Sequence, residues 1–574
     1  MTPDLQEALA AADRRQVDGD PAGAVALYDA VLAADPSVWT AHANRGLALA
    51  VCGRDAAARA GFRRAIAIAP DAAPALRNLV DSLLLDATTD ASLPTMANAL
   101  RALLPGAAEA LLAVGRVELR LDHAAPGLRA LRRAITLAPA EGEALAAYGQ
   151  ALPTEGGVCW LGRLAAAMPT AETLAAHGRA EAALGRNGTA RRALRRAIAL
   201  DPGRDVALVE FTSVLDASAD ALDLVRWGRR AIARVPASAA AWNNLGTAEL
   251  SFGRLEQAER SFAAATALQP GFAEPHFNRA TPLFLAGRSE EAWAEYEWRS
   301  RIERFERPPS AAPRWAGDPL RGRTLLVHDE QGIGDSLQFI RYLPLVDPDG
   351  GRVVLACDPR LVRLFRAALP QIAVSARPSL PPHDVAVPLP SLPYLLGATK
   401  GHGTCPYLAA PDPVSIAAGG RLRVGLVWSG NPAHVRDRER SIPLSLLGDL
   451  VARRDIAWIS LQVGPGREDI ARLGLTEQIA DLGAGVSDML DTARIVAGLD
   501  LVLAVDTSTA HLAGALGRPV WTMISWLPDW RWGMRGAATP WYPSMRLFRQ
   551  PQPGDWRATV AAVAEALDEQ SSLR

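Results

Sequence analysis

Residues suited to catalysis gather at the ends of a few apolar runs in the second half of the chain. The first such segment, His328-Asp-Glu-Gln-Gly332-Ile-Gly334-Asp335, follows the apolar run TLLVH. Glycines let a backbone approach a ligand closely, and a helix that opens at Asp335 offers free N–H groups. Two interpretations stay open: a tight turn in which Asp335 caps the helix, or a site in which Asp335 is a general base facing a cleft.

The second segment joins one carboxylate to three hydroxyl residues. Asp506, Thr507, Ser508 and Thr509 directly follow the apolar run LVLAV. A helix beginning here combines unpaired N–H groups, the positive end of the helix dipole and hydroxyl donors, which together suit a diphosphate. Capping accounts for one of the hydroxyls but not for three. His511, one turn further on, is either a ligand contact or a packed core histidine.

Two more loops are candidates for donor binding. Ser429 and Asn431 follow the apolar run RVGLVW, and three arginines come within the next nine residues. Of these, Arg440 is the best candidate to meet an anionic ligand, because it directly precedes a helix that Ser441 would cap. Gln462 lies in the loop LQVGPGRED, which is either a plain loop or a place for a nucleotide base.

The elements that must position these loops alternate short apolar runs with amphipathic stretches from residue 323 onward. The expected strands are 324–328, 352–356, 384–389, 423–428, 457–463, 500–505 and 519–524. Continuous Val/Ile/Leu runs alternating with helices indicate parallel sheets covered on both faces. The runs form two sets, 323–415 and 420–574, and so predict an α/β region of two Rossmann-like halves with a cleft between them. Ligands of such sheets bind beyond the carboxyl ends of the strands.

The first half of the chain has a different period. Prolines recur every 30 to 35 residues, at Pro36, Pro70, Pro105, Pro139, Pro169, Pro202, Pro236 and Pro270. Glycines keep phase with them, both at an expected helix contact (such as Gly46 and Gly246) and at an expected turn (such as Gly53). The unit resembles the tetratricopeptide repeat, a helical hairpin that buries its apolar face by stacking. The expected organisation is an all-α array of about nine hairpins over 1–306, a proline-rich linker over 307–322, and the α/β region. Cutting within 306–322 should then give two independently folded pieces.

The α/β segments carry a second resemblance. GIGDSLQFIRYLPLV, VGLVWSGNP and VDTSTAHLAGALGRPV resemble the bacterial heptosyltransferase class, whose fold is GT-B. The combination with repeats resembles the O-linked N-acetylglucosamine transferases and, more closely, bacterial flagellin glycosyltransferases that transfer nonulosonic acids such as pseudaminic acid. The resemblance implies that Asp335 is the base and that the donor diphosphate lies on 506–509 near His511. It puts the acceptor on 323–415 and the donor on 420–574. These enzymes use a lysine where the nearest cation here is Arg440.

The repeats have their own candidate binding residues. Four asparagines lie eight residues after a repeat proline: Asn44, Asn78, Asn244 and Asn278. In the N-acetylglucosamine transferases, asparagines at this place form a ladder that binds peptide backbone, for which an amide can both donate and accept. Here the ladder is broken by Ala113, Ala147 and Glu210. Polar residues on an exposed helix face are the alternative interpretation.

Composition excludes several classes. The formal charge of -1, with 21% charged residues, indicates no nucleic-acid footprint, and the four cysteines lack metal or disulfide spacing. Asp347-Pro-Asp349-Gly is formally D-x-D, but it is interpreted as a turn, so no metal is expected. The tryptophan-rich stretch 526–532 is expected to pack between domains or against the repeats rather than on sugar. No signal segment or long apolar stretch is present, which predicts a soluble, cytoplasmic protein without membrane insertion.

The resulting hypothesis is a metal-independent protein O-glycosyltransferase with no cofactor beyond its nucleotide-sugar co-substrate. It would move a sugar, such as pseudaminic acid, to Ser/Thr of flagellin held by the repeat array. Two alternatives stay open: a heptosyltransferase-like enzyme acting on a saccharide or lipid-linked acceptor, and a non-catalytic repeat scaffold.

Overall fold

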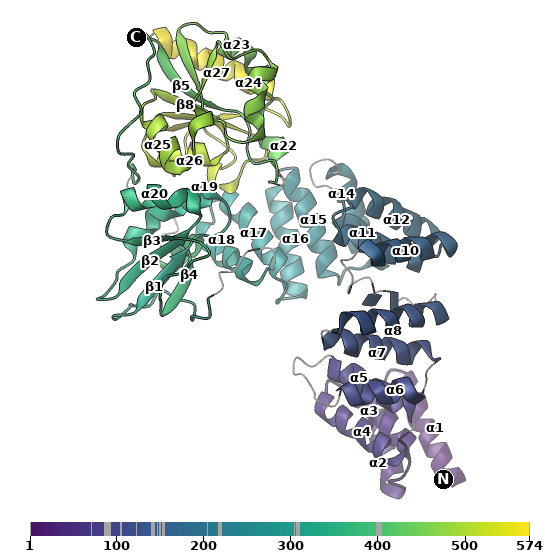
Figure 1. Cartoon of the computed structure of the whole chain (residues 1–574). Coiled ribbons are helices and arrows are strands. Elements are labelled where there is room, and N and C mark those ends of the chain that lie inside the picture. Colours follow the sequence, from purple (N-terminus) through teal and green to yellow (C-terminus); the bar gives the residue numbers. More distant parts are fainter. Residues whose placement is uncertain are drawn as a thin grey trace. The chain divides into compact units, whose positions relative to one another are not determined.

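The computed structural model divides into two compact units, Met1–Asp216 and Ala217–Arg574 (Figure 1). It describes residues 2–572 except 71, 85–92, 104–105, 122, 139–143, 146, 149–150, 152–154, 204, 216–220, 303–304, 306–309, 398–404 and 435. The predicted repeat positions Pro105, Pro139 and Gly149 lie outside the described residues, as do Pro308 and Pro309 of the predicted linker.

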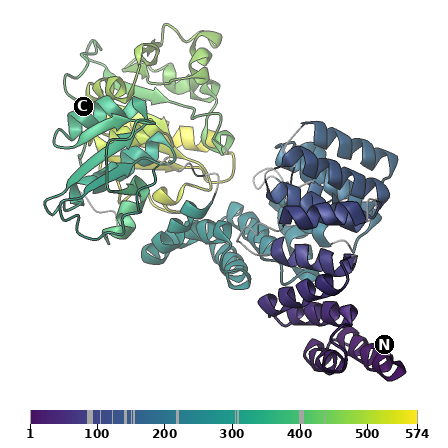
Figure 2. The same cartoon turned by 60° about the horizontal axis from the view of Figure 1, so that its bottom comes forward.

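The first unit consists of helical hairpins that stack in chain order (Figure 2). Its helices are α1 (Pro3–Val17), α2 (Pro21–Ala34), α3 (Trp39–Val51), α4 (Asp55–Ile68), α5 (Ala73–Leu84), α6 (Leu93–Leu103), α7 (Ala108–Arg120), α8 (Ala124–Leu137), α10 (Glu155–Ala167), α11 (Ala171–Ala183), α12 (Asn187–Leu200) and α13 (Asp205–Ser213). A Cβ on Gly46 would lie 2.7 Å from the Phe62 ring, so glycine lets α3 and α4 touch. Gly53 turns the chain between these helices with φ +71°. The predicted hairpin glycines are confirmed here.

The second unit begins with more hairpins and continues into parallel sheets. Its repeat helices are α14 (Ala221–Arg234), α15 (Ala239–Ser251), α16 (Leu255–Leu268), α17 (Ala273–Leu285) and α18 (Ser289–Tyr296), followed by the 3-10 helix η1 (Glu297–Arg301). Gly246 and Phe262 repeat the close contact between α15 and α16, with a hypothetical Cβ 2.7 Å from the ring. The repeat pattern thus extends across both units.

Two sheets follow, and all their strand pairs are parallel. The four-stranded sheet has the order β3-β2-β1-β4, with β1 (Thr324–His328), β2 (Arg352–Cys357), β3 (Ala373–Ala376) and β4 (Val385–Pro388). The six-stranded sheet has the order β10-β9-β8-β5-β6-β7, with β5 (Leu422–Val427), β6 (Ile456–Ser460), β7 (Ile479–Asp481), β8 (Leu501–Val505), β9 (Val520–Ile524) and β10 (Met545–Arg549). The seven predicted strands are confirmed as elements, and β3, β7 and β10 are additional.

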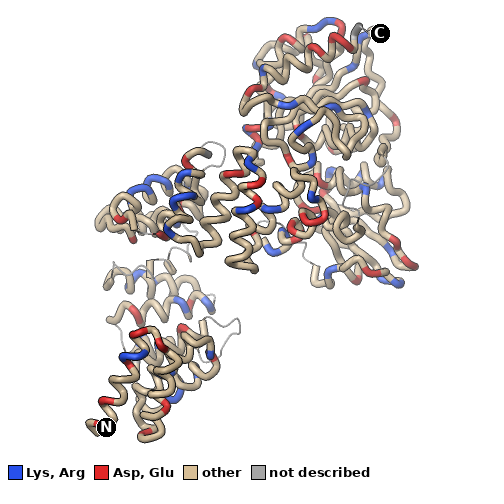
Figure 3. Tube along the Cα trace, turned by 180° about the vertical axis from the view of Figure 1, so that it is seen from behind, with Lys and Arg blue, Asp and Glu red and all other residues tan. Residues whose placement is uncertain are grey.

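Short helices connect the strands, and a helix of 17 residues follows β10. They are α19 (Ile333–Phe339), η2 (Ile340–Leu345), α20 (Pro359–Ala368), η3 (Leu389–Ser391), α21 (Leu392–Leu395), α22 (Asp437–Arg440), η4 (Leu444–Leu447), α23 (Gly448–Val451), η5 (Pro465–Glu468), α24 (Asp469–Arg472), η6 (Leu482–Gly485), α25 (Met489–Ala497), α26 (Ser508–Ala515), η7 (Trp530–Trp532) and the terminal α27 (Trp556–Ser572). In this α/β region acidic and basic residues are mixed along the trace rather than separated by sign (Figure 3).

The last repeat helices share one hydrophobic core with the α/β region. Trp293 and Tyr296 of α18 belong to the same buried cluster as Leu325 of β1 and Phe339 of α19. Residue 306 therefore marks a change of secondary structure within the second unit, and the two compact units separate some ninety residues earlier. Trp530 stacks on Phe284 of α17, with centroids 4.2 Å apart, so the tryptophan-rich stretch packs against the repeats as predicted.

Candidate functional site

The two segments singled out for chemistry lie against each other. The β1–α19 turn comes from the four-stranded sheet, the β8–α26 turn from the six-stranded sheet, and α19 packs on α26. A Cβ on Gly334 would lie 3.0 Å from Cδ2 of His511. Glycine at 334 therefore permits the close approach of the two turns. Arg531 forms an ion pair with Asp335 and also lies close enough to Asp506 to influence its pKa.

Asp335 is engaged twice. Its Oδ2 accepts a hydrogen bond of 2.9 Å from the backbone N–H of Gly332, and its Oδ1 forms an ion pair with Arg531. The capping interpretation is confirmed with one correction: α19 begins at Ile333, Gly332 is its N-cap, and Asp335 is its third residue. A carboxylate at the third position reaches back to the N-cap N–H, which accounts for the shift of two residues. The role of Asp335 as general base stays a prediction.

Arg531 is the central cation of the site, and the sequence did not single it out. Its side chain is only 8% exposed and also pairs with Asp529 at 2.8 Å and with the amide oxygen of Gln338. Burial opposes its charge, but the carboxylates of Asp529 and Asp335 outweigh burial and raise the pKa of Arg531. One feature of the sequence could have indicated Arg531: it is a charged residue between two aromatic residues, Trp530 and Trp532.

The start of α26 has no side-chain cap among the described residues. Thr507 is the N-cap, yet its Oγ1 donates to the carbonyl of Val505 at 3.2 Å instead of capping the helix. Within the described part of the chain, the backbone N–H groups of Ser508 and Thr509 have no hydrogen-bond partner. Burial, with the neighbouring Asp529, raises the pKa of Asp506 to about 6. The turn thus places the backbone N–H donors of Ser508 and Thr509 next to the Asp506 carboxyl group, which takes up a proton at a higher pH than an ordinary aspartate.

His511 is a packed residue. It is buried, its Nδ1 lies 2.9 Å from the hydroxyl of Tyr542, and its ring lies 5.1 Å from that of Trp532. Burial lowers the pKa of His511 to about 3, with the charge of Arg531 adding to the effect. The imidazole is therefore neutral at physiological pH, and of the two interpretations the structure favours the core histidine.

Gln462 ties two strand ends together. Its Oε1 accepts from the backbone N–H groups of Trp428 (3.2 Å) and Ser429 (3.0 Å). Its Nε2 donates to the carbonyls of Ser429 (3.1 Å) and Val463 (3.0 Å). These four hydrogen bonds use both the oxygen and the nitrogen of the buried Gln462 side-chain amide. Gln462 therefore fixes the position of Ser429, just beyond the end of β5.

The arginine segment differs from the prediction. Arg440 is the last residue of the four-residue α22, and Ser441 follows that helix rather than capping the next one. Both residues contact Asp437: Arg440 Nε at 3.3 Å and Ser441 Oγ at 3.1 Å. Arg440 still lies close enough to Asp506 to influence its pKa. Asn431 accepts from a backbone N–H two residues ahead in an exposed turn.

The repeat asparagines are all half-buried on the first helices of their hairpins. Asn44 donates to Asp13 at 2.9 Å, and Asn278 donates to Asn243 at 3.0 Å. These contacts link one hairpin to the preceding one. Asn78 and Asn244 occupy the same place on α5 and α15. Peptide binding by the four residues stays a prediction.

Other features can be placed plainly. Asp347 Oδ1 accepts from the N–H of Asp349 at 3.0 Å, so the predicted D-x-D turn is confirmed as a turn. Among the described residues no three His, Cys, Asp or Glu side chains cluster as metal ligands. Of the helices in the described ranges, none combines the length and apolarity that crossing a bilayer requires.

These observations define a repeat protein with an α/β region, and comparison with known proteins agrees at that level. A tetratricopeptide repeat model matches residues 9–73 and 226–271, so the chain contains tetratricopeptide repeats. The chain is 29% identical over 427 residues to Protein FlbA of Caulobacter vibrioides, covering 67% of this chain and 70% of that protein.

Two solved structures are similar over about half of the chain. The Cut9-Hcn1 hetero-tetramer of the APC/C is 19% identical with a TM-score of 0.33, covering 50% of this chain and 56% of that one. A tetratricopeptide repeat protein from Parabacteroides merdae is 14% identical with a TM-score of 0.32, covering 47% of this chain and 94% of that one.

Proposed function

We propose that the protein is a glycosyltransferase that moves a sugar from a nucleotide-sugar donor to a protein hydroxyl. The observation that carries the proposal is the meeting of two turns: Asp335 at the start of α19 and the open N-terminus of α26. One supplies a carboxylate suited to accept a proton, and the other supplies donors suited to phosphate oxygens. A sugar transfer that combines a general base with a phosphate leaving group needs both at one place.

On the donor side, the leaving phosphate would accept from the N–H groups of Ser508 and Thr509 and from their hydroxyls. Helix N-termini stabilise developing negative charge without reorganising. The neutral form of Asp506 could add a hydrogen bond, while its ionised form would repel a phosphate. Arg440, Asn431 and Ser429 line the neighbouring β5 loop and would contact the rest of the donor, although Arg440 already pairs with Asp437.

On the acceptor side, Asp335 would remove the proton from the attacking hydroxyl. The repeat array would hold the acceptor protein, as stacked hairpins present extended binding surfaces. The resemblance to bacterial flagellin glycosyltransferases supports flagellin as acceptor and a nonulosonic acid, such as pseudaminic acid, as the sugar. Transfer would need no metal, because the helix terminus and nearby arginines can neutralise the phosphate. The reaction would take place in the cytoplasm.

The test is intact-mass analysis of purified flagellin incubated with the full-length protein and a panel of nucleotide sugars. We expect a mass increment equal to one or more sugars, in chelator as well as without it. Asp335→Asn should abolish the increment, whereas Asp347→Asn, an exposed turn carboxylate, should leave it unchanged. Transfer to a free saccharide but never to protein would favour the heptosyltransferase-like alternative. Normal turnover by Asp335→Asn would remove Asp335 from the mechanism.

A further inference from the structure

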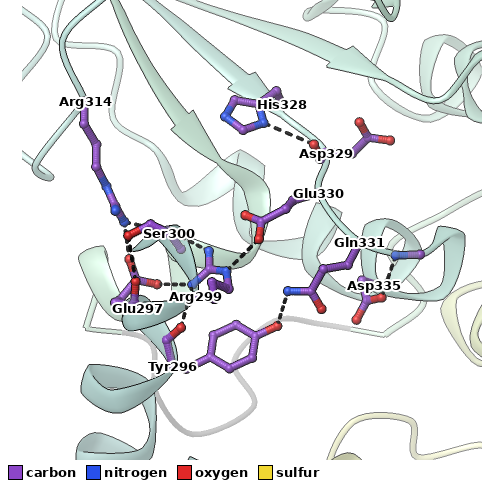
Figure 4. A network of polar contacts seen from close by, with 12 residues as sticks. Tyr296, Glu297, Arg299, Ser300, Arg314, His328, Asp329, Glu330, Gln331 and Asp335 are labelled. Atoms are coloured by element: carbon purple, nitrogen blue, oxygen red, sulfur yellow. Dashed lines mark hydrogen bonds and ion pairs between the residues drawn. The ribbon is translucent and has the colours of Figure 1, made fainter. Parts of the chain in front are cut away.

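Three consecutive residues of the loop after β1 are each held by a polar anchor, and Figure 4 shows the anchors of Glu330 and Gln331. Asp329 accepts from the backbone N–H of Asp358 at 2.7 Å. Glu330 pairs with Arg299 at 3.1 Å, and Gln331 donates from Nε2 to the hydroxyl of Tyr296 at 2.6 Å. The first anchor, Asp358, directly follows β2 and is the N-cap of α20. The other two come from the last repeat, at the end of α18 and in η1.

Arg299 is an unusually fixed anchor. Its side chain is 1% exposed, and besides Glu330 it contacts Glu297 at 2.6 Å, the hydroxyl of Ser391 at 2.6 Å and the carbonyl of Tyr296 at 3.2 Å. A planar guanidinium that bonds in several directions leaves its partners little freedom. Burial raises the pKa of Glu330, and the charge of Arg299 opposes that rise. Glu330 therefore depends on the repeat for its compensating charge.

Gln331 is held in a conformation that side chains disfavour. Its φ is +68°, the left-handed region, and the residue is exposed, so packing does not impose this geometry. Strained non-glycine residues persist when surrounding contacts determine them. The hydrogen bond to Tyr296 is such a contact, and it comes from outside the loop. The next residue, Gly332, is the N-cap whose N–H is bonded by Asp335, so the backbone direction at Gln331 sets where that carboxylate points.

We propose that Tyr296 and Arg299 of the last repeat are positioning residues for Asp335. They fix the loop 329–332, and through Gly332 they fix the carboxylate that the reaction would use as base. The last hairpin is then part of the transferase site and not only part of the array that holds the acceptor. The catalytic consequence rests on the proposed function, whereas the anchoring of the loop does not.

The test uses Tyr296→Phe in the full-length protein, which removes one hydroxyl and keeps the ring against Trp293 and Phe284. The matched control is Tyr342→Phe, because the buried hydroxyl of Tyr342 has no hydrogen-bond partner among the described residues. Loss of one neutral hydrogen bond should speed amide exchange of peptides covering 329–335 about fivefold in Tyr296→Phe only. The melting temperature should fall by no more than about 2–4 °C, because the hydrogen bond contributes only about 1 kcal/mol. The kcat for transfer should fall about fivefold with an unchanged donor KM, because the donor contacts lie on the other sheet.

Gln331→Gly provides a second variant, in which the positive φ at position 331 causes no backbone strain. Glycine adopts φ +68° freely, so the fold should keep its stability while the tether to Tyr296 is lost. It should reproduce both effects of Tyr296→Phe. Exchange rates unchanged in both variants would overturn the anchoring, and faster exchange with an unchanged kcat would overturn the positioning role. If exchange accelerates but the wild type transfers no sugar, the anchoring stands and only the proposed function fails.

Discussion

The last repeats should be required for the α/β region to fold, which can be tested by comparing the fragments 217–574 and 323–574. The shorter fragment corresponds to the domain boundary expected from the sequence. It leaves Glu330 buried without Arg299, and it removes the aromatic neighbours of Trp530 and Phe339, namely Phe284 and Trp293. The longer fragment keeps all these contacts.

The expected loss is as large as the stability of a whole domain. Removing one partner of a buried ion pair costs about 3–5 kcal/mol. Exposing roughly 100 Å² on each of Trp530 and Phe339 costs about 2.5 kcal/mol apiece at about 25 cal/mol per Å². The sum, about 8–10 kcal/mol, is comparable to the 5–15 kcal/mol or so by which a typical domain is stable.

The assay is urea unfolding followed by circular dichroism and tryptophan fluorescence. We expect the fragment 217–574 to unfold in one cooperative transition, and 323–574 to show a much lower midpoint or none. Arg299→Met in the longer fragment isolates the ion-pair part of the effect, about 3–5 kcal/mol. Equal midpoints for the two fragments would refute the reasoning and restore the boundary near residue 306.

Three further results are expected. The pKa of His511 is lowered to about 3 and that of His328 to about 4, below the value of about 6.5 for histidine in the unfolded chain. The free energy of unfolding should therefore be highest above pH 6.5 and decrease as the pH falls, by about 2 kcal/mol for each histidine at pH 5. Denaturation curves at pH 5 and 8 check this, and His511→Gln should lessen the difference between them. Gln462→Leu removes four hydrogen bonds from a buried bridge and should cost about 2–3 kcal/mol in urea unfolding; an unchanged midpoint would contradict the bridging role. Because the pKa of Asp506 is raised to about 6, calorimetry should find nucleotide affinity falling as pH rises through 6, and Asp506→Asn should abolish that dependence.

Much of the fold was predictable because it depends on period. The 34-residue spacing placed the hairpins, and Gly46 and Gly53 performed the two roles their spacing indicated. Seven strands were continuous apolar runs and were found. The three missed strands gave weaker signals: β3 and β7 have only four and three residues, and β10, at a sheet edge, contains the charged residues Arg546 and Arg549 among its five residues.

The site was predictable only where it follows from sheet topology. The loops at the carboxyl ends of strands were expected to bind ligands, and the two Rossmann-like halves were expected to meet at a cleft, so the meeting of the Asp335 and His511 turns from the two sheets could be anticipated. Arg531 lies 196 residues from Asp335, and no local pattern indicates an ion pair across that distance. The anchoring contacts of Tyr296 and Arg299 could not be predicted for another reason. The change of sequence period near residue 306 suggested a domain boundary, whereas the hydrophobic core is continuous from the last repeat into the α/β region.

The two interpretations of Asp335, helix cap and base, turn out to be compatible. To accept a proton, Oδ1 must exchange Arg531 for the acceptor hydroxyl. Arg531 would keep Asp529 at 2.8 Å and the amide oxygen of Gln338, so the buried cation remains compensated after the exchange. Oδ2 would keep the N–H of Gly332, so the carboxylate retains its orientation. The contacts that make Asp335 structurally useful in the free protein are therefore the ones that would hold it in place when a substrate displaces Arg531.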